Sequence, residues 1–555
     1  MKATIQESQI SIKSKPKFIF VSGGVISGIG KGVTTASIAL LLKRQGYKVC
    51  IVKCENYLNI DSGTINPIEH GDPFLTQDGL EADMDLGTYE RFLDEEMGFR
   101  NFITLGQVYK SVIDRERAFG YEGKTLEPVE VISREIISRI KKSQEETDAD
   151  IVVIELGGTA GEYQNIMYYE SSRIMQYRFK DQVIHVHVAY APIPNHLGEP
   201  KSKPIQLSVK TLNGMGIQPN FIVVRSEQLF DEKRREKLSM YCNLDAEDII
   251  ANPDLETIYE LPLIFNEQGF SEKILDKLNL KSKKLDLTDW KKLIEKIKSP
   301  KSKSTTVAIV GKYFATGDYA LLDSYASLLE SIKHAGWNLD TQVNLKFINS
   351  EKQEKEIEEL LKDVDGIIVP IGWGARGAEG KIKAIKYARE NKVPYLGLCY
   401  GMQLACVEFA RDVLKLKDAN TTENDADTKY PIIHLIPEEE KYVRIKSKGV
   451  AMRLGGYDCL VKKGTLTSTI YGGAEKVSER HRHRFEFNNE FREQFEKAGF
   501  VFSGTSPDNF FVEMIELPQN VHPFFVATQA HPEYKSTPLK PHPMFVEFIK
   551  ATQKG

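Results

Sequence analysis

The sequence is poor in cysteine and has no long apolar runs. Its six cysteines among 555 residues stand at positions 50, 54, 242, 399, 406 and 459, and their spacing matches neither zinc-ligand pairs nor a disulfide framework. No apolar run approaches the roughly 20 residues that a membrane helix needs. Residues 1–16 lack the apolar core of a signal peptide and are expected to form a flexible tail. These absences predict a cytoplasmic protein that does not contact a membrane.

An excess of charge of either sign is also missing. The 74 basic and 78 acidic residues give a net charge of −4, so the chain has no basic footprint and nucleic acid is not an expected partner. A hydrophobic content of 41% and a charged content of 27% are typical of an ordinary globular protein. There is no internal repeat. At this length the chain should hold two or more domains.

The composition changes most sharply over residues 281–304, which are rich in lysine and serine. A short amphipathic helix is expected around Trp290 and should end at Pro300. We interpret this stretch as a linker, with a partner-docking patch as the less favoured alternative. Apolar runs alternate with helical patterns on both sides of it. They occur at 18–21, 49–54, 151–158, 183–192 and 221–226, and again at 306–313, 343–350, 365–374, 393–401 and 524–533. This alternation predicts an α/β protein with two doubly wound domains, over 17–280 and 305–555.

The first domain opens with a glycine-rich turn between a strand and a helix, FIFVSGGVISGIGKGVTT (18–35). Backbone N–H groups and the start of the helix in such a turn can hold phosphate, and Lys31 would add a point charge. Gly32 replaces the metal-binding hydroxyl of the standard phosphate loop, so Mg²⁺ must find its ligands elsewhere. The alternative is a glycine-rich turn with a surface lysine.

Polar side chains follow the next strands of this domain. Lys53 ends the second apolar run, and the glycine- and acid-rich passage 57–92 is expected to be irregular and functional. Asp85 in that passage and Glu155 at the end of a later run can supply the hard oxygen ligands that Mg²⁺ prefers. Each carboxylate could equally be a solvated or capping residue.

The second domain contains a cysteine between two glycines directly after a strand, in VPYLGLCYGMQ (393–403). A G-x-C-x-G turn is typical of a nucleophile elbow, which exposes Cys399 above the sheet. His531 in the late QAHPE motif is the expected base, and Glu533 can orient its ring. A buried structural cysteine is the alternative, but the joint pattern favours catalysis.

This pairing resembles the class I glutamine amidotransferase domain over about 305–555. The resemblance implies an oxyanion hole completed by the loop 370–374, which has Ile371 where glycine is expected. It also implies that glutamine contacts Gly372, Gln403, Glu423 and Arg484. Arg484 belongs to the run ERHRHRFEF (479–487), which otherwise indicates an exposed loop or an anion patch.

Over nearly the whole chain, the motifs FVSGGVISGIGKG, DGLEADMDLGTYERF, ELGGTAG, KSKPIQLSVK, GLCYGMQ, ERHRHR and HPEYKSTP resemble the CTP synthase family. The resemblance implies a P-loop-like amidoligase domain before an amidotransferase domain, and amination of UTP through a 4-phosphorylated intermediate. It also implies a homotetramer (a dimer of dimers) that could stack into filaments, with GTP as an activator. It places His70 near the ammonia path. The implied ATP site is Ser27, Gly28, Ile29, Gly30, Lys31, Gly32, Lys53 and Asp85, with Mg²⁺ on Asp85 and Glu155. The implied UTP and CTP site is Ser27, Lys201, Gln206 and Lys237.

Two of the segments that depart from the family pattern bear on the acceptor. They are GTAGEYQ (158–164), where the family has acidic residues that read the cytosine product, and DRERAFGYEGKTLEPVEVISRE (114–135), beside the family's pyrimidine site. The first change predicts weak inhibition by CTP. Together they leave open an amidoligase of the same architecture that aminates a different nucleotide or carbonyl. A non-enzymatic filament or regulatory protein is a third hypothesis, which the retained motif residues disfavour.

Overall fold

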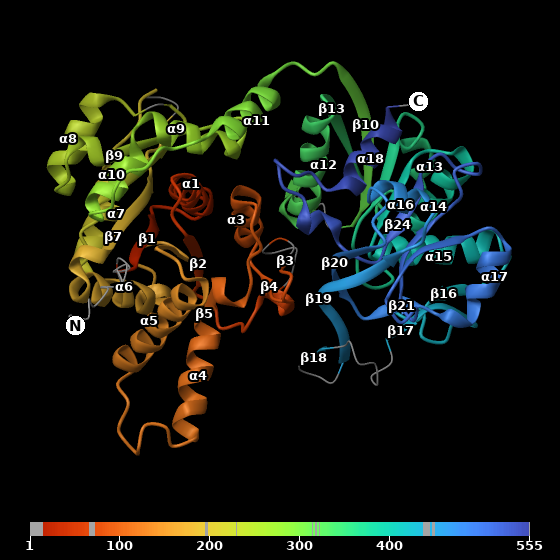
Figure 1. Ribbon diagram of the computed structural model, residues 1–555, viewed down its shortest axis with the longest axis horizontal. Helices are drawn as coiled ribbons and strands as arrows, with labels where there is room; N and C mark the ends of the chain where they lie inside the picture. Colours follow the sequence, from red (N-terminus) through yellow and green to blue (C-terminus); the bar gives the residue numbers. More distant parts are fainter. Residues whose placement is uncertain are drawn as a thin grey trace, which may run out of the picture. The chain divides into compact units, whose positions relative to one another are not determined.

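The chain is described from a computed structural model, over residues 15–65, 71, 73–194, 198–228, 230–312, 315–316, 319–320, 322–436, 444–446 and 450–553. The described residues divide into two compact units. The first comprises those of 1–60 and 100–287, and the second those of 61–99 and 288–555 (Figure 1). The division near residue 287 falls within the predicted linker. Residues 61–99 lie in the second unit although they precede that linker.

The first unit is built on a seven-stranded sheet in the order β5-β2-β6-β1-β7-β8-β9, in which every neighbouring pair is parallel. Its strands are β1 (Lys17–Gly24), β2 (Val49–Glu55), β5 (Phe102–Thr104), β6 (Ile151–Leu156), β7 (Val183–Tyr190), β8 (Phe221–Ser226) and β9 (Ile249–Pro253). Its helices are α1 (Lys31–Arg44), α4 (Leu105–Arg117), α5 (Pro128–Thr147), α6 (Ile166–Arg178), α7 (Lys203–Gly214), α8 (Glu232–Cys242), α9 (Leu261–Glu267) and α10 (Phe270–Lys277).

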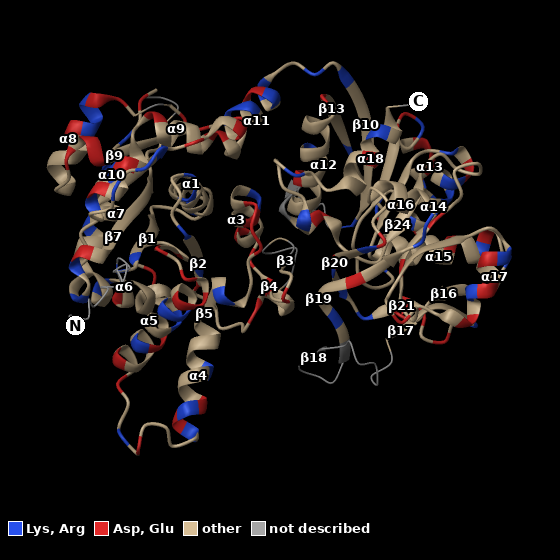
Figure 2. Ribbon diagram, viewed as in Figure 1, with Lys and Arg blue, Asp and Glu red and all other residues tan. Residues whose placement is uncertain are grey.

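The central strands of this sheet are apolar on both faces. In β1, Phe18 and Phe20 pack in one cluster with Ile136 of α5, and the alternating Ile19 and Val21 are fully buried on the opposite side. This burial explains why the strand is a continuous apolar run instead of an alternating one. The strands predicted from the apolar runs are confirmed. The acidic and basic residues gather on outer helices such as α5 and α8, as Figure 2 shows.

The second unit holds a ten-stranded sheet in which β13-β10-β14-β15-β24 are parallel and continue into the antiparallel β23-β22-β19-β18, with β20 also paired to β19. Its strands are β10 (Lys303–Gly311), β13 (Thr341–Asn349), β14 (Gly366–Val369), β15 (Tyr395–Leu398), β18 (Arg444–Lys446), β19 (Val450–Val461), β20 (Lys476–His483), β22 (Val501–Thr505), β23 (Val512–Glu516) and β24 (Phe525–Thr528). Small ladders add β3 (Phe74–Leu75), β4 (Glu81–Ala82), β11 (Ala315–Thr316), β12 (Tyr319–Ala320), β16 (Ala419–Thr421), β17 (Tyr430–Leu435) and β21 (Phe485–Phe487).

The helices of the second unit include those that cover the two faces of this sheet. They are α3 (Asp85–Leu93), α11 (Thr288–Lys298), α12 (Ala326–Asn338), α13 (Ile357–Leu360), α14 (Ala378–Asn391), α15 (Tyr400–Asp412), α16 (Leu466–Ile470), α17 (Arg492–Lys497) and α18 (Pro543–Thr552). Ala308 and Val310 of β10 pack on the face of α14 and α15, whereas Val307 and Ile309 pack on the face of α12 and α18. The doubly wound α/β prediction therefore holds for this unit as well.

The predicted helix around Trp290 is confirmed as α11, and Trp290 itself is fully buried. Two other expectations are wrong. The end of the passage 57–92 is not irregular, because α3 buries Leu86, Tyr89 and Phe92 at helical spacing. The run 479–487 does not form an exposed loop, since β20 and β21 occupy most of it and its buried charges have partners elsewhere in the unit.

Among the described residues, we find no helix long and apolar enough to cross a membrane.

Candidate active sites

Cys399 occupies a strained turn between β15 and α15. Its backbone has φ 50° and ψ −100°, a left-handed conformation that non-glycine residues rarely adopt. Glycine is required two residues later, because a Cβ at Gly401 would lie 2.1 Å from the carbonyl oxygen of Val369. This is the geometry expected of a nucleophile elbow, and it supports the predicted role of Cys399.

His531 and Glu533 form the second part of this site, just after β24. His531 Nδ1 lies 2.8 Å from Glu533 Oε1, and both side chains are buried. Burial disfavours the imidazolium, but the interactions of His531 with the Glu533 and Cys399 side chains outweigh it and raise the pKa of His531 to about 10. Within the described residues, Nε2 has no hydrogen-bond partner of ordinary geometry, so this atom is available for proton transfer. The three groups can form the thiolate–imidazolium pair that nucleophilic catalysis needs.

Gln529 also touches the thiol, and sequence reasoning did not single it out. Its Nε2 donates to Cys399 Sγ over 3.5 Å, and its Oε1 accepts from Gln403 Nε2 at 3.1 Å. The only signal in the sequence was its place two residues before His531. Gln403, predicted to bind glutamine, therefore reaches the nucleophile through Gln529, and its amide also donates to the carbonyl of Phe485.

The loop 370–374 lies against the elbow. A Cβ at Gly372 would come within 3.0 Å of the Tyr400 ring, which places this loop beside the residue that follows Cys399. Lys381 is fully buried and donates to the carbonyls of Pro370 (2.8 Å) and Ile371 (3.2 Å). Burial lowers the pKa of Lys381 well below its usual range. Because these carbonyls face the lysine, the loop's conformation is fixed by a residue that the sequence analysis missed.

A second buried lysine, Lys312, donates to the carbonyls of Trp373, Gly374 and Arg376 in the following stretch of the loop. Burial and the Arg376 charge lower the pKa of Lys312 to about 8. The backbone N–H of Gly374 donates to Glu423 Oε1 at 2.9 Å.

Three of the four predicted glutamine-binding residues lie around this loop. Burial raises the pKa of Glu423, and the charges of Lys312 and Arg484 oppose that shift, so Arg484 acts on the same carboxylate. Unlike the buried residues before it in the run 479–487, Arg484 is exposed. Gly372, Glu423 and Arg484 thus lie close to one another. Gln403 contacts the thiol indirectly, through its hydrogen bond to Gln529.

The glycine-rich turn of the first unit has the conformation expected of a phosphate loop. Gly28 and Gly30 have positive φ angles of 71° and 84°, and nothing lies within 4 Å of a Cβ at either position. Gly30 caps the start of α1, whose first residues are Lys31 and Gly32. Ser27 is exposed, Ile29 is buried, and Lys31 Nζ donates to the Gly158 carbonyl at 3.0 Å. The open turn with a lysine at the helix start can hold an anion.

Lys53 and Glu155 are brought together by neighbouring strands. They are register partners in the pairing of β2 with β6, and Lys53 Nζ lies 2.7 Å from Glu155 Oε1 and 3.1 Å from Glu55 Oε1. All three side chains are buried. Lys53 Nζ thus lies within ion-pair distance of two carboxylates, and carboxylate oxygens are ligands that suit a cation bound together with phosphate.

The two predicted metal ligands lie in different units. Glu155 is the residue before the last of β6 in the first unit. Asp85 begins α3 in the second unit, where its N–H donates to Asp83 Oδ1 at 2.9 Å. No group of three or more His, Cys, Asp or Glu side chains with metal-site geometry occurs in the described parts of the chain. Mg²⁺ usually takes one or two protein oxygens and completes its shell with phosphate and water, so Asp85 and Glu155 stay predicted ligands.

The residues predicted to hold UTP are spread over three places in the first unit. Ser27 is in the glycine-rich turn. Lys201 precedes α7 and pairs with Glu199, while Gln206 in α7 bonds to Ser202 at 3.3 Å. Lys237 is exposed on α8. The structure gives these four no common contact, so this set stays a prediction. His70 lies outside the described residues.

Fold and site together define a class: a glutamine-hydrolysing amidotransferase domain joined to a phosphate-binding ligase domain. The family model for the CTP synthase N-terminus matches residues 17–280, and that for class I glutamine amidotransferases matches 320–551. A CTP synthase of Halalkalibacterium halodurans is 46% identical over 97% of this chain and 99% of its own. One from Carboxydothermus hydrogenoformans is 47% identical over 97% and 99%. The chain also matches the Trypanosoma brucei CTPS glutaminase domain with bound acivicin, at 33% identity and a TM-score of 0.41 over 45% of this chain and 94% of that one. The chain belongs to the CTP synthase family.

Proposed function

We propose that this chain converts UTP to CTP, using ATP and the amide nitrogen of glutamine. The observation that carries the proposal is the buried group of Cys399, His531 and Glu533 in one unit, in a chain whose other unit opens with a phosphate loop. Relatives named CTP synthase cover 97% of the chain.

The thiol site would release ammonia from glutamine. The Cys399 thiolate attacks the amide carbon, a C–S bond forms, and the amide nitrogen leaves as ammonia after taking a proton from His531 Nε2. Water then cleaves the thioester and releases glutamate. The loop held by Lys381 supplies backbone N–H groups for the oxyanion, and Glu533 keeps the imidazole oriented.

The phosphate loop would activate the acceptor. The γ-phosphoryl group of ATP is transferred to the 4-oxygen of UTP, ammonia attacks C4, and phosphate leaves with that oxygen. The N–H groups at the start of α1 and the Lys31 ammonium would bind the phosphates. When bound on Asp85 and Glu155, Mg²⁺ supplies neutralising charge for phosphoryl transfer. We assign Ser27–Gly32 and Lys53 to ATP.

The remaining ligand sites follow the family resemblance. UTP or CTP would contact Ser27, Lys201, Gln206 and Lys237, glutamine would contact Gly372, Gln403, Glu423 and Arg484, and GTP would act as an activator. The clustering of three of the glutamine residues around the loop 370–374 supports the second set.

A small cavity lies beside the thiol site in the second unit. It is lined by Met84 and Arg91 from the segment that carries Asp85, by Ile371 of the loop, and by Glu533 and Tyr534. Its volume of about 10 Å³ is room for one water-sized molecule. A molecule the size of ammonia would fit there, which supports nitrogen release toward that segment.

Assembly and location are further parts of the proposal. A homotetramer is supported by exposed apolar side chains on the first unit, among them Ile113 of α4 and Phe119 beyond its end, which are 57% and 72% exposed. A cytoplasmic location is supported by the six cysteines, all of which are buried thiols outside any disulfide. No finding supports the alternative of a different acceptor.

Replacing the nucleophile tests the two-site scheme. Cys399→Ala should abolish CTP formation driven by glutamine, because no thiolate remains to attack the amide. CTP formation driven by added ammonium should persist, since the ligase site is untouched. The measurement is CTP produced from UTP and ATP with each nitrogen source. Loss of both activities in a folded variant would refute the scheme.

A further inference from the structure

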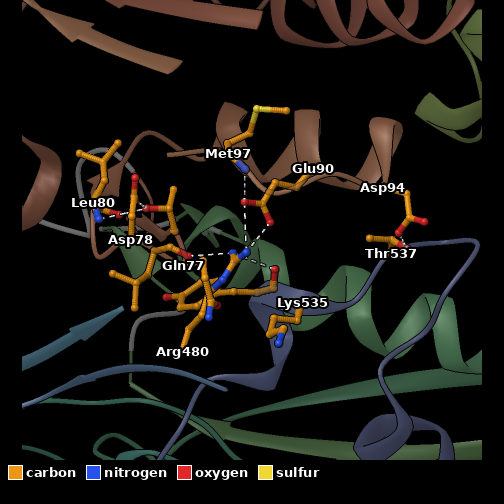
Figure 3. Close-up of polar contacts among 12 residues, drawn as sticks. Gln77, Asp78, Leu80, Glu90, Asp94, Met97, Arg480, Lys535 and Thr537 are labelled. Atoms are coloured by element: carbon orange, nitrogen blue, oxygen red, sulfur yellow. Dashed lines mark hydrogen bonds and ion pairs between the residues drawn. The ribbon is translucent and has the colours of Figure 1, made fainter. Parts of the chain in front are cut away.

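Strand β20 joins the segment 61–99 to the thiol site within the second unit. Two side chains of β20, at positions 480 and 482, contact that segment. Arg480 Nη2 lies 2.9 Å from Glu90 Oε2, and Arg482 Nε lies 2.7 Å from Glu81 Oε1. All four side chains are buried, with exposures of 1% for Arg480 and 7% for Glu90. Figure 3 shows Arg480 directed at Glu90 of α3.

The backbone of the same strand holds both members of the reacting pair. The carbonyl of Arg480 accepts the backbone N–H of His531 at 2.8 Å. The carbonyl of Arg482 accepts the thiol of Cys399 at 3.8 Å, the longer distance usual for sulfur. A shift of β20 along its axis would therefore displace the thiol and the imidazole together.

Arg480 is held from several directions. Its Nη1 donates to the carbonyls of Leu75 (3.0 Å) and Tyr534 (3.3 Å), and its guanidinium lies 5.5 Å from the centre of the Phe74 ring. Tyr534 in turn stacks on His531, with ring centres 5.2 Å apart. The guanidinium thus bridges β3, α3 and the turn that carries the base.

The segment 61–99 has other contacts with the rest of the second unit besides the buried pair of Arg480 and Glu90. Asp94, at the end of α3, already binds the unit through an exposed ion pair with Lys540 and a 3.2 Å hydrogen bond from Thr537. A buried ion pair carries a desolvation penalty and is weak grounds for stability by itself. Displacement of a reacting group by about 1 Å can cost about a hundredfold in rate.

We propose that Arg480, paired with Glu90, is a positioning residue that sets the geometry of Cys399 and His531 from the segment 61–99. Asp85 starts the helix that carries Glu90, so the pair connects a residue assigned to the ligase site with the glutaminase base. The link between this pair and amination rests on the proposed function. The effect of the pair on glutamine hydrolysis can be measured without assuming that function.

The test compares Arg480→Met, Glu90→Gln and the double variant in the full-length protein. Arg480→Met should lower kcat for glutamine hydrolysis about 10- to 100-fold, with KM for glutamine changed less than about threefold, because the binding loop is untouched. The single variants leave one buried charge unpaired and should melt at lower temperature. The double variant should regain melting temperature but not kcat, which separates positioning from stability.

Lys540→Met is the matched control, since it removes another contact of the same segment without touching β20. It should keep the wild-type kcat. If the methionine variants do not fold, Arg480→Lys replaces them in the test. Its kcat should fall between that expected of Arg480→Met and that of the wild type, because an ammonium cannot reach all the partners of the guanidinium. A wild-type kcat in the folded double variant would overturn the proposal. Where Arg480→Lys is used in its place, a wild-type kcat in that variant would do the same. An equal loss of kcat in Lys540→Met would also overturn it. Ammonium-driven CTP formation by the wild type separately tests the proposed function.

Discussion

At the scale of single residues, the chemistry depends on groups whose neighbours change their charge state. His531 lies between a carboxylate and a thiol, and these hold its pKa at about 10 despite burial. The pKa of this imidazole exceeds its usual value near 6.5, so the resulting stabilisation of the fold is fully present below pH 6.5 and is lost as the pH rises toward 10. The His531 imidazolium therefore persists through neutral pH.

Glu533→Gln tests this ion pair. The change removes the carboxylate that raises the pKa of His531, so the imidazolium should lose its proton at lower pH. We expect the alkaline decline of kcat/KM for glutamine hydrolysis to move below that of the wild type, with the plateau lowered on the order of tenfold. The measurement is the rate profile from pH 6 to 10.5. An alkaline limb that does not move would contradict the assignment.

Lys31 is the residue that we assign to the phosphates in the proposed ligase site. Lys31→Ala should lower CTP formation by about a hundredfold or more with either glutamine or ammonium, because the phosphates lose their point charge. Glutamine hydrolysis without nucleotides should be unchanged. Lys48→Ala, at an exposed lysine of the same unit, is the control and should behave as the wild type. Normal ammonium-driven turnover in Lys31→Ala would exclude the phosphate role.

At the scale of elements, the apolar runs and the two turns could be predicted because their determinants are local. A run such as 151–156 is a strand wherever it lies between two layers of helices, and Gly401 marks the elbow through its spacing to Cys399. The burial of β20 could not be predicted. Inside the unit, Arg480 and Arg482 form ion pairs with Glu90 and Glu81, which stand about 400 residues earlier in the chain. Their pairing depends on tertiary structure alone.

Helix α3 was missed for a related reason. Its surroundings are rich in glycine and acidic residues, which indicate loops, while its stability comes from side chains that meet a distant helix. Phe92 is 1% exposed, and its ring centre lies 5.6 Å from that of Trp290 in α11. Tertiary packing here outweighs the local composition.

Phe92→Ala measures that packing. Removing the buried ring should lower the free energy of unfolding of the second unit by about 3–5 kcal/mol. Phe99→Ala is the control, because Phe99 is 55% exposed in the same segment and should cost well under 1 kcal/mol. Urea unfolding of both variants gives the comparison. If both variants lost the same small amount of unfolding free energy, the contact between Phe92 and Trp290 would not be what stabilises α3.

At the scale of the whole molecule, each unit contains a site that is chemically incomplete without the other. In the proposed scheme the thiol site yields ammonia, and the phosphate loop activates a carbonyl oxygen that ammonia then replaces. Membership of the CTP synthase family supplies the acceptor that the sequence alone left open. The departures at 114–135 and 158–164 leave the nucleophile, the base and the phosphate loop unchanged.

Assembly is the prediction that belongs to this scale. With ATP and UTP present, sedimentation should give a particle of about 250 kDa, four copies of the 62.9-kDa chain. The apolar residues exposed on the first unit would be covered in that particle. A monomer at all protein concentrations and with both nucleotides would contradict the proposed tetramer.

The most direct measurement follows the nitrogen itself. The protein is incubated with ATP, Mg²⁺, glutamine labelled with ¹⁵N in its amide, and one nucleotide at a time, and ADP and the labelled product are measured. The account predicts ADP release and a ¹⁵N-labelled 4-amino group only when UTP is present, with the product being CTP. Release of ADP that is indifferent to UTP, or CTP without the label, would contradict it.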